Sequence, residues 1–190
     1  MMNHDFEQLT GQIKHLLTQK EYVLLAIDGR CAAGKTTLSA QLQEMFPCTV
    51  LHMDDFFLTP AQRTPERLAE PGGNVDRERF AAEVLEPLCA HCPFLYRRFD
   101  CATQTFLPPV EIVPQRLTVV EGAYACHPEL REAYDLRVFL DIDAQTQFER
   151  LRRRSAEKLQ MFLDRWIPLE EAYFAAFSVR ENCDLLLRLC

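Results

Sequence analysis

Short apolar runs alternate along this chain with segments in which apolar residues recur every three or four positions. The runs lie at 22–27, 48–53, 117–120, 137–140 and 185–187, and each has the length of a strand buried in a sheet. The periodic segments are 5–19, one that ends at Phe46, 76–91 and the region after residue 143, and they predict helices. Strands that alternate with helices predict an α/β fold, with a parallel sheet covered by helices on both faces.

The same periodicity assigns individual positions to the interior. Leu38, Leu42 and Met45 share one face of the helix that ends at Phe46. Trp166 and its aromatic neighbours are expected in the core. The helix that carries Trp166 is expected to bend near Pro168.

Two further segments are irregular in pattern. Residues 58–75 are rich in Pro and Gly and predict a loop. Residues 94–114 alternate weakly between apolar and polar positions, which predicts a small β-hairpin excursion. The sequence shows no internal repeat and no linker, so we expect residues 1–190 to form a single domain.

Composition and charge exclude several classes of protein. The hydrophobic fraction of 48% is typical of a globular chain. The formal net charge of −7 argues against a general nucleic-acid or membrane-surface binder. No apolar run is long enough to span a bilayer, and the segment Met1 to Phe6 lacks the core of a signal peptide. The expected location is therefore the cytoplasm.

The eight cysteines are scattered, and free thiols are the simplest interpretation in a reducing compartment. Cys89 and Cys92 form the only C-x-x-C pair. A zinc or redox role for this pair is disfavoured, because no second ligand pair stands at a suitable spacing.

The stretch from Gly29 to Thr36 has the spacing of a phosphate-binding P-loop, with a strand before it and a helix after it. Gly29 and Gly34 permit backbone angles that a side chain would forbid, so that the loop N–H groups form a nest for an anion. Lys35 supplies a positive charge for the β- and γ-phosphates, and the Thr36 hydroxyl is placed to ligate Mg²⁺. The predicted nucleotide-binding residues are Gly29, Arg30, Cys31, Ala32, Ala33, Gly34, Lys35, Thr36 and Thr37. Cys31 could also be a reactive thiol, if the helix terminus lowers its pKa.

Three carboxylates follow buried strands, at the sheet edge where parallel α/β proteins bind ligands. Asp54 and Asp55 end the second run, and we expect only one of them to face the phosphate because successive strand side chains point in opposite directions. Glu121 ends the third run and is predicted to orient Mg²⁺ or its water. A loop-capping role for the aspartates and a purely structural role for Glu121 remain alternatives.

An arginine-dense segment follows the fourth run. Arg150 and Arg154 would share one face of a helix, which favours phosphate binding over a solvated charged face. For Arg152 and Arg153 the two interpretations are equally supported.

Taken together, these features resemble the uridine kinase-like P-loop kinases, a group that also includes phosphoribulokinase and bacterial pantothenate kinase. The matching features are the glycine loop with Lys35-Thr36-Thr37, Asp54-Asp55-Phe56-Phe57, Asn74-Val75-Asp76 ahead of a helix, Val119-Val120-Glu121-Gly122, and the arginine run after Asp141-Ile142-Asp143. They follow in the family's order over most of the chain. A P-loop alone implies only a nucleoside triphosphatase, whereas the whole set implies a kinase of a small hydroxyl compound.

The resemblance also implies roles for particular residues. It implies a five-stranded parallel sheet and a mobile lid at about 144–165, which includes Arg150 and Arg154. Asp54 matches the catalytic base, and Asp76 matches an acid that holds sugar hydroxyls. Phe57 and Phe99 match aromatic positions near the acceptor.

The expected function is ATP- and Mg²⁺-dependent phosphoryl transfer to a hydroxyl of a small metabolite, with a nucleoside as the first candidate. The hairpin segment 99–104 lacks the Tyr and His that grip the pyrimidine in that family, so pantothenate kinase or phosphoribulokinase-like activity stays open. A P-loop regulatory ATPase with a protein partner is the alternative from another class, although no Asn-Lys-x-Asp element for guanine is present. The sequence leaves the oligomeric state open, a homo-oligomer included.

Overall fold

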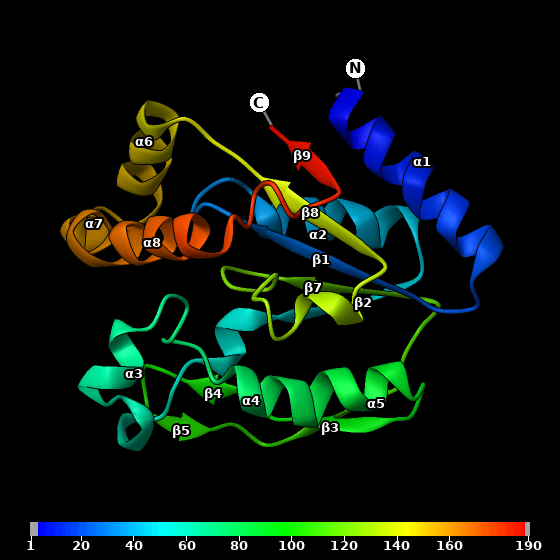
Figure 1. The fold of residues 1–190 in the computed structure, drawn as a ribbon, viewed down its shortest axis with the longest axis horizontal. Helices are drawn as coiled ribbons and strands as arrows, with labels where there is room; N and C mark the ends of the chain where they lie inside the picture. The colour runs from blue at the N-terminus through cyan, green and yellow to red at the C-terminus, as the bar shows by residue number, and fades with distance from the viewer. Residues whose placement is uncertain (1–3, 189–190) are drawn as a thin grey trace.

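Five parallel strands form a sheet in the order β2–β7–β1–β8–β9 (Figure 1). The structure is a computed structural model that describes residues 4–188. The strands are β1 (Val23–Gly29), β2 (Cys48–His52), β7 (Leu117–Glu121), β8 (Leu136–Leu140) and β9 (Leu185–Leu187). β1 lies at the centre, and its Leu25 is paired with Val119 of β7 and with Leu136 of β8. The predicted α/β fold with a parallel sheet is confirmed.

The side chains of the sheet supply two hydrophobic cores, one on each face. Val23, Leu25 and Ile27 of β1 join one core, whereas Leu24 and Ala26 join the other. This is the alternation that the pleat imposes on a strand buried on both faces.

Helices α1 (His4–Gln19) and α2 (Lys35–Met45) cover the first face. Leu9 and Ile13 of α1 and Leu38 and Leu42 of α2 are fully buried there, as their spacing predicts. Met45 is 41% exposed, so its predicted place on the buried face is wrong. It is the last residue of α2, and the neighbouring Phe46 is buried in its place.

The helical segment 76–91 packs on the second face. It consists of α4 (Arg77–Phe80), the π-helix η3 (Ala81–Leu85) and α5 (Glu86–Cys89). The residues predicted to face inward, Phe80, Val84, Leu85 and Leu88, are all buried.

Both π-helical segments of the described chain end shortly before a proline. η3 precedes Pro87, and η6 (Phe162–Trp166) precedes Pro168. Proline removes one N–H donor, and its ring would clash with the carbonyl four residues earlier, which in each case lies inside the π-helical turn. The wider turn relieves that clash, and it lies just before Pro168, where the sequence predicts a bend.

The chain after β8 forms a helical arm beyond the carboxyl ends of the strands (Figure 1). Its elements are α6 (Ala144–Arg154), η5 (Ala156–Lys158), α7 (Leu159–Met161), η6 and α8 (Ile167–Phe177). Trp166 is half-buried, so its assignment to the core is corrected. Tyr173 of α8 is fully buried and belongs to the core of the second face.

The predicted hairpin excursion is present as two antiparallel ladders. β3 (Phe94–Tyr96) pairs with β6 (Val110–Ile112), and β4 (Phe99–Asp100) pairs with β5 (Thr105–Phe106). The predicted loop before it contains two short helices, η2 (Pro60–Gln62) and α3 (Pro65–Ala69). The remaining short helices are η1 (Met53–Phe56), which shortens the predicted second strand by one residue, and η4 (Arg131–Ala133).

Between residues 4 and 188, no helix combines the length and the apolar character needed to cross a bilayer. The predictions that concerned residues 1–3 and Cys190 lie outside the described residues.

Leu38→Ala should destabilise the fold by about 2–5 kcal/mol, because it removes a fully buried side chain from the core between α2 and the sheet. Met45→Ala on the same helix should change the free energy of unfolding by less than about 0.5 kcal/mol. Urea unfolding of both variants measures the difference. A Met45→Ala cost as large as that of Leu38→Ala would contradict the packing of α2.

Candidate active site

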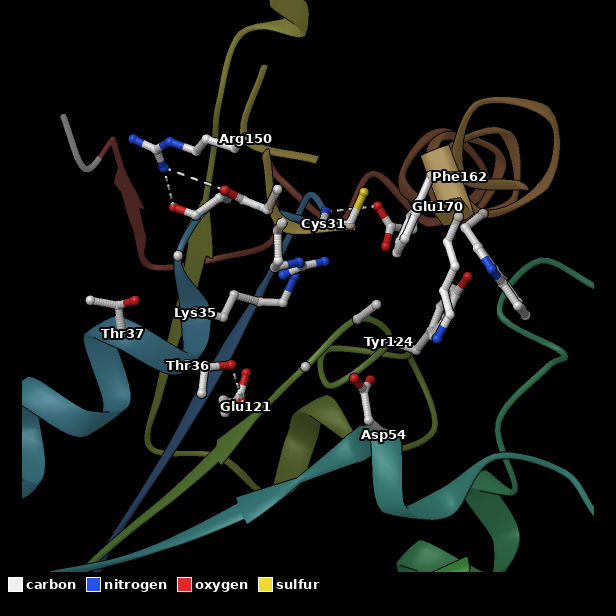
Figure 2. A pocket seen from close by; sticks show the side chains of 18 of the residues that line it. Cys31, Lys35, Thr36, Thr37, Asp54, Glu121, Tyr124, Arg150, Phe162 and Glu170 are labelled. Atoms are coloured by element: carbon white, nitrogen blue, oxygen red, sulfur yellow. Dashed lines mark hydrogen bonds between the residues drawn. The ribbon is translucent and has the colours of Figure 1, made fainter. Parts of the chain in front are cut away.

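A cavity of about 860 Å³ opens at the carboxyl ends of β1, β2 and β7, between the P-loop and the helical arm (Figure 2). Besides P-loop residues 31–37, its walls are formed by Asp54, Phe57, Asn74, Glu121, Gly122, Ala123, Tyr124, Arg150, Arg153, Arg154, Lys158, Met161, Phe162, Trp166 and Glu170. One side of the cavity is therefore basic and another aromatic, with carboxylates between them.

The P-loop has the backbone conformation that its glycines predict. Gly29 has a φ of 132° and Gly34 a φ of 107°, in the region that favours glycine. A Cβ atom on Gly29 would lie 2.1 Å from the Leu140 carbonyl oxygen, so the loop also leaves β1 in close contact with β8. α2 begins at Lys35, and a helix N-terminus presents N–H groups and a partial positive charge to an anion.

Two cationic side chains hold the P-loop from opposite directions. Lys35 Nζ donates hydrogen bonds to the carbonyl oxygens of Gly29 at 2.6 Å and Arg30 at 3.1 Å. Arg150 Nη1 donates to the carbonyl oxygens of Ala32 at 3.3 Å and Ala33 at 3.4 Å (Figure 2). Both charges thus lie against the backbone of the P-loop.

Thr36 and Glu121 form a pair of hard oxygen donors beneath the loop. The Thr36 hydroxyl donates to Glu121 Oε1 at 3.1 Å, and His52 Nδ1 lies 2.6 Å from the same oxygen. That hydrogen bond to Glu121 raises the pKa of His52. Mg²⁺ prefers such oxygens and completes its shell with water and substrate phosphates, so a larger protein cage is not required. The residues therefore fit the metal that the sequence predicts.

Asp54 and Asp55 point in different directions, as predicted, but the cause is a 3₁₀ turn and not strand alternation. Both lie in η1, where successive side chains are about 120° apart. Asp54 projects into the cavity and its side chain remains exposed there; loss of water to nearby protein atoms raises its pKa, and Lys35 opposes that rise (Figure 2). Asp55 Oδ2 accepts a hydrogen bond from the Tyr96 hydroxyl at 2.8 Å, away from the cavity wall.

The acceptor residues implied by the resemblance are only partly brought together. Phe57 lines the cavity, with its ring centroid 6.2 Å from that of Trp166. Asp76 is the N-cap of α4 and accepts hydrogen bonds from the Arg79 backbone and the Gln62 side chain. Phe99 packs on Phe106 with ring centroids 5.3 Å apart. Neither Asp76 nor Phe99 forms part of the cavity wall, and their predicted roles remain predictions.

Three arginines of α6 face the cavity. Arg150, Arg153 and Arg154 line it, because positions three and four apart share a helix face. Arg152 is absent from the lining, and its guanidinium lies 6.0 Å from the Phe148 ring. Arg30 is also directed elsewhere: its side chain bonds to Glu171 and Asp141, so it contributes to the P-loop only through its backbone.

Glu170 was missed by the sequence analysis. Its carboxylate accepts a hydrogen bond from the Cys31 N–H at 2.9 Å, and burial raises its pKa. The signal was an acidic residue among the apolar positions of 167–177. Burial and the neighbouring Glu170 raise the pKa of the Cys31 thiol to about 12, so the hypothesis of a thiol with a lowered pKa is wrong.

Asp28 was missed as well, although it follows the apolar run of β1 directly. It is fully buried, and burial raises its pKa. Oδ1 accepts hydrogen bonds from the N–H groups of Gly29 at 2.7 Å and Tyr124 at 3.2 Å. Oδ2 accepts from the Cys126 N–H and from the Tyr173 hydroxyl, each at 2.9 Å. The start of the P-loop, the loop after β7 and α8 therefore meet at one carboxylate.

Comparison with known proteins gives one consistent group of relatives. No family model matches the chain. A uridine kinase of Chloroflexus aggregans is 30% identical over 146 residues, which are 72% of this chain and 69% of that protein. A uridine kinase of Chlamydia pneumoniae is 26% identical over 148 residues, 73% of this chain and 64% of that protein.

Solved structures show the same fold. The structure of a possible uridine kinase from Bacillus stearothermophilus matches with a TM-score of 0.70 at 22% identity, over 95% of this chain and 99% of that one. YFH7 from Saccharomyces cerevisiae, a P-loop protein, matches with a TM-score of 0.68 at 12% identity, over 98% and 99% of the two chains.

His127, in the loop after β7, should make stability depend on pH. Burial lowers its pKa from 6.5 to about 4, so the folded protein keeps it neutral while the unfolded chain takes up a proton. The stability that depends on neutral His127 is fully present above pH 6.5. As the pH falls from 6.5 towards 4, the free energy of unfolding decreases by about 1–3 kcal/mol. His127→Gln should therefore flatten the pH dependence of the free energy of unfolding in this window.

His15→Gln is the matched control, because His15 is exposed on α1. Its pH profile should follow that of the wild type. A His127→Gln protein with the wild-type slope between pH 6.5 and 4 would contradict the shift.

Proposed function

The chain belongs to the uridine kinase-like family of P-loop kinases, and from this we propose that it transfers the γ-phosphoryl group of ATP to a hydroxyl group of a small metabolite, a nucleoside being the first candidate. The observation that carries the proposal is that Lys35, Thr36, Asp54 and Glu121 converge on one cavity with a basic helix face opposite. A protein that only binds or hydrolyses a nucleotide needs no site for a second substrate. Asp54 and the aromatic wall of the cavity offer such a site.

The donor side of the cavity suits a nucleoside triphosphate. P-loop N–H groups and Lys35 hold the β- and γ-phosphates, and Arg150 and Arg154 neutralise charge that develops on the transferred group. Mg²⁺, held by Thr36 and Glu121 together with phosphate oxygens, would supply further charge neutralisation there. The cavity volume of about 860 Å³ accommodates a nucleotide and a small acceptor together.

The acceptor side supplies positioning and a base. Asp54 orients the acceptor hydroxyl and takes its proton as the new P–O bond forms. The protein atoms around Asp54 raise its pKa although its side chain is exposed, and a raised pKa makes the carboxylate a better proton acceptor. Phe57 and Trp166 offer flat apolar surfaces on which a ring can pack.

The proposed lid is the part of the arm at about 144–165, within a single domain that spans 1–190. It carries Arg150 and Arg154, and the π-helical turn η6 ends it just before Pro168. Turns of this kind often mark functional positions in helices. Closure of the arm over the cavity would exclude water from the transferred phosphoryl group.

A panel of hydroxyl compounds, with ADP production as the readout, tests the function. Nucleosides are expected to stimulate ADP release more than pantothenate or a sugar phosphate. Stimulation by pantothenate or by a sugar phosphate alone would instead favour one of the related kinase activities. ADP release that no acceptor stimulates would favour the regulatory ATPase.

Asp54→Asn should lower kcat by roughly 10² to 10⁴, the usual range for a lost general base, and leave ATP affinity near that of the wild type. Asp55→Asn is the matched control in the same turn; it should cost less, since Asp55 bonds to Tyr96 outside the cavity. Steady-state kinetics with the best acceptor measure both. If Asp55→Asn is the more damaging change, Asp55 is the base; if neither matters, the acceptor does not bind at η1.

Arg154→Ala should lower kcat by roughly 10²-fold, because its guanidinium meets charge mainly in the transition state. ATP affinity should fall much less. Arg152→Ala, two residues away on α6 and outside the cavity lining, should keep near wild-type kinetics. Equal effects of the two substitutions would show that this helix face acts only as solvated charge.

A further inference from the structure

Two cysteines from distant parts of the chain touch behind the active site. The Sγ atoms of Cys126 and Cys183 are 3.9 Å apart, and the residues are separated by 57 positions. Cys126 lies in the loop after β7 and is buried, whereas Cys183 lies between α8 and β9 and is half-buried. One thiol is thus enclosed by the protein and the other is reachable from solvent.

The surroundings allow the sulfur atoms to approach further. A disulfide needs an S–S distance of about 2.04 Å, so the two atoms must close by about 2 Å. Cys183 belongs to neither a helix nor a strand, and a turn segment shifts more easily than a packed element. Cys126 is fixed more firmly, because its N–H is bonded to the buried Asp28.

We propose that Cys126 and Cys183 form a reversible disulfide whose formation weakens nucleotide binding. A low-molecular-weight disulfide such as oxidised glutathione is the oxidant. The Cys183 thiolate attacks one sulfur of the oxidant, forms a mixed disulfide and releases one glutathione as its thiolate. Cys126 then gives its proton to that thiolate, attacks Cys183 Sγ and displaces the second glutathione as a thiolate, which takes up the proton that Cys183 gave to solvent. Two protein thiols are oxidised, and one disulfide is reduced to two thiols.

The order of attack follows from the environment of each thiol. The pKa of Cys126 is raised by its hydrogen bond with Cys183 and by burial. Cys126 therefore stays protonated until a mixed disulfide forms at Cys183. The more exposed Cys183 is the thiol that an oxidant can reach.

The link to nucleotide binding runs through Asp28. Oδ2 of Asp28 holds the Cys126 N–H, and Oδ1 holds the N–H of Gly29 at the start of the P-loop. Tyr124, two residues before Cys126, also donates its N–H to Asp28 and lines the cavity. The part of the approach that the Cys183 turn does not take up would fall on Cys126, and it would pull on these bonds and on the cavity wall. The P-loop would then lose part of the support that holds its shape.

The test incubates the full chain with oxidised glutathione, maps the peptides by mass spectrometry and titrates ATP affinity by fluorescence. We expect a peptide pair joined through Cys126 and Cys183, reversed by dithiothreitol, and an ATP affinity reduced by roughly fivefold or more. Linkage requires the reciprocal effect, so saturating ATP should favour the dithiol form by the same factor in a glutathione redox buffer.

Cys183→Ser should abolish the joined peptide and the response of ATP affinity to the oxidant, and Cys126→Ala should do the same if it folds. Cys89→Ser is the matched control, since Cys89 is exposed at the end of α5 and should leave both effects intact. Absence of the Cys126–Cys183 peptide, or an ATP affinity unchanged by its formation, would overturn the proposal. Peptide mapping and ATP titration need no acceptor, so these results stand apart from the proposed kinase reaction.

Discussion

The carboxylate of Asp28 is the constraint on which the rest of the site depends. Burying a carboxylate costs several kcal/mol unless hydrogen bonds replace the water it loses. Here three backbone N–H groups and the Tyr173 hydroxyl replace that water, so the carboxylate is stable only while its donors stay in place. Because the donors come from the P-loop, the loop after β7 and α8, these segments are positioned together. The shape of the phosphate-binding loop is therefore a property of the protein core.

Helix α8, the last element of the arm, connects the basic part of the arm to this core. Glu170 holds the Cys31 N–H, Glu171 holds the Arg30 side chain, and Tyr173 reaches Asp28. Three positions within four residues thus fasten one helix to the P-loop. The arginines of α6 are joined to α8 through short helices and a π-helical turn, which make few contacts with the sheet. The arm is thereby anchored at its carboxyl end, next to the P-loop and the cavity that its arginines line.

Local sequence patterns were sufficient for the elements whose structure is decided locally. The P-loop was predictable because Gly29 and Gly34 have φ values that only glycine adopts readily, and the sheet because its apolar runs are buried on both faces. The hydrogen-bond partners of individual side chains were harder to predict from the sequence. Asp55 turns to Tyr96 and Asp76 to Gln62, contacts that join segments far apart in the sequence or set within an irregular loop. Asp28 and Glu170 were missed for the same reason, since their donors, apart from the Gly29 N–H, come from distant segments. Periodicity also failed for Met45 and Trp166, because a helix end and a cavity wall interrupt the buried face.

The strand order has a consequence for how the chain folds while it is being synthesised. β1 is made early, yet both of its neighbours, β7 and β8, are made far later, and its Leu25 must wait for Val119 and Leu136. During synthesis the chain therefore exposes an apolar central strand before its partner strands have been made. An exposed strand of this kind can aggregate or bind a chaperone. Parallel sheets that close long loops also form slowly. Since Gly29 at the start of the P-loop packs against Leu140, a nascent chain gains its phosphate-binding shape only after β8 has left the ribosome.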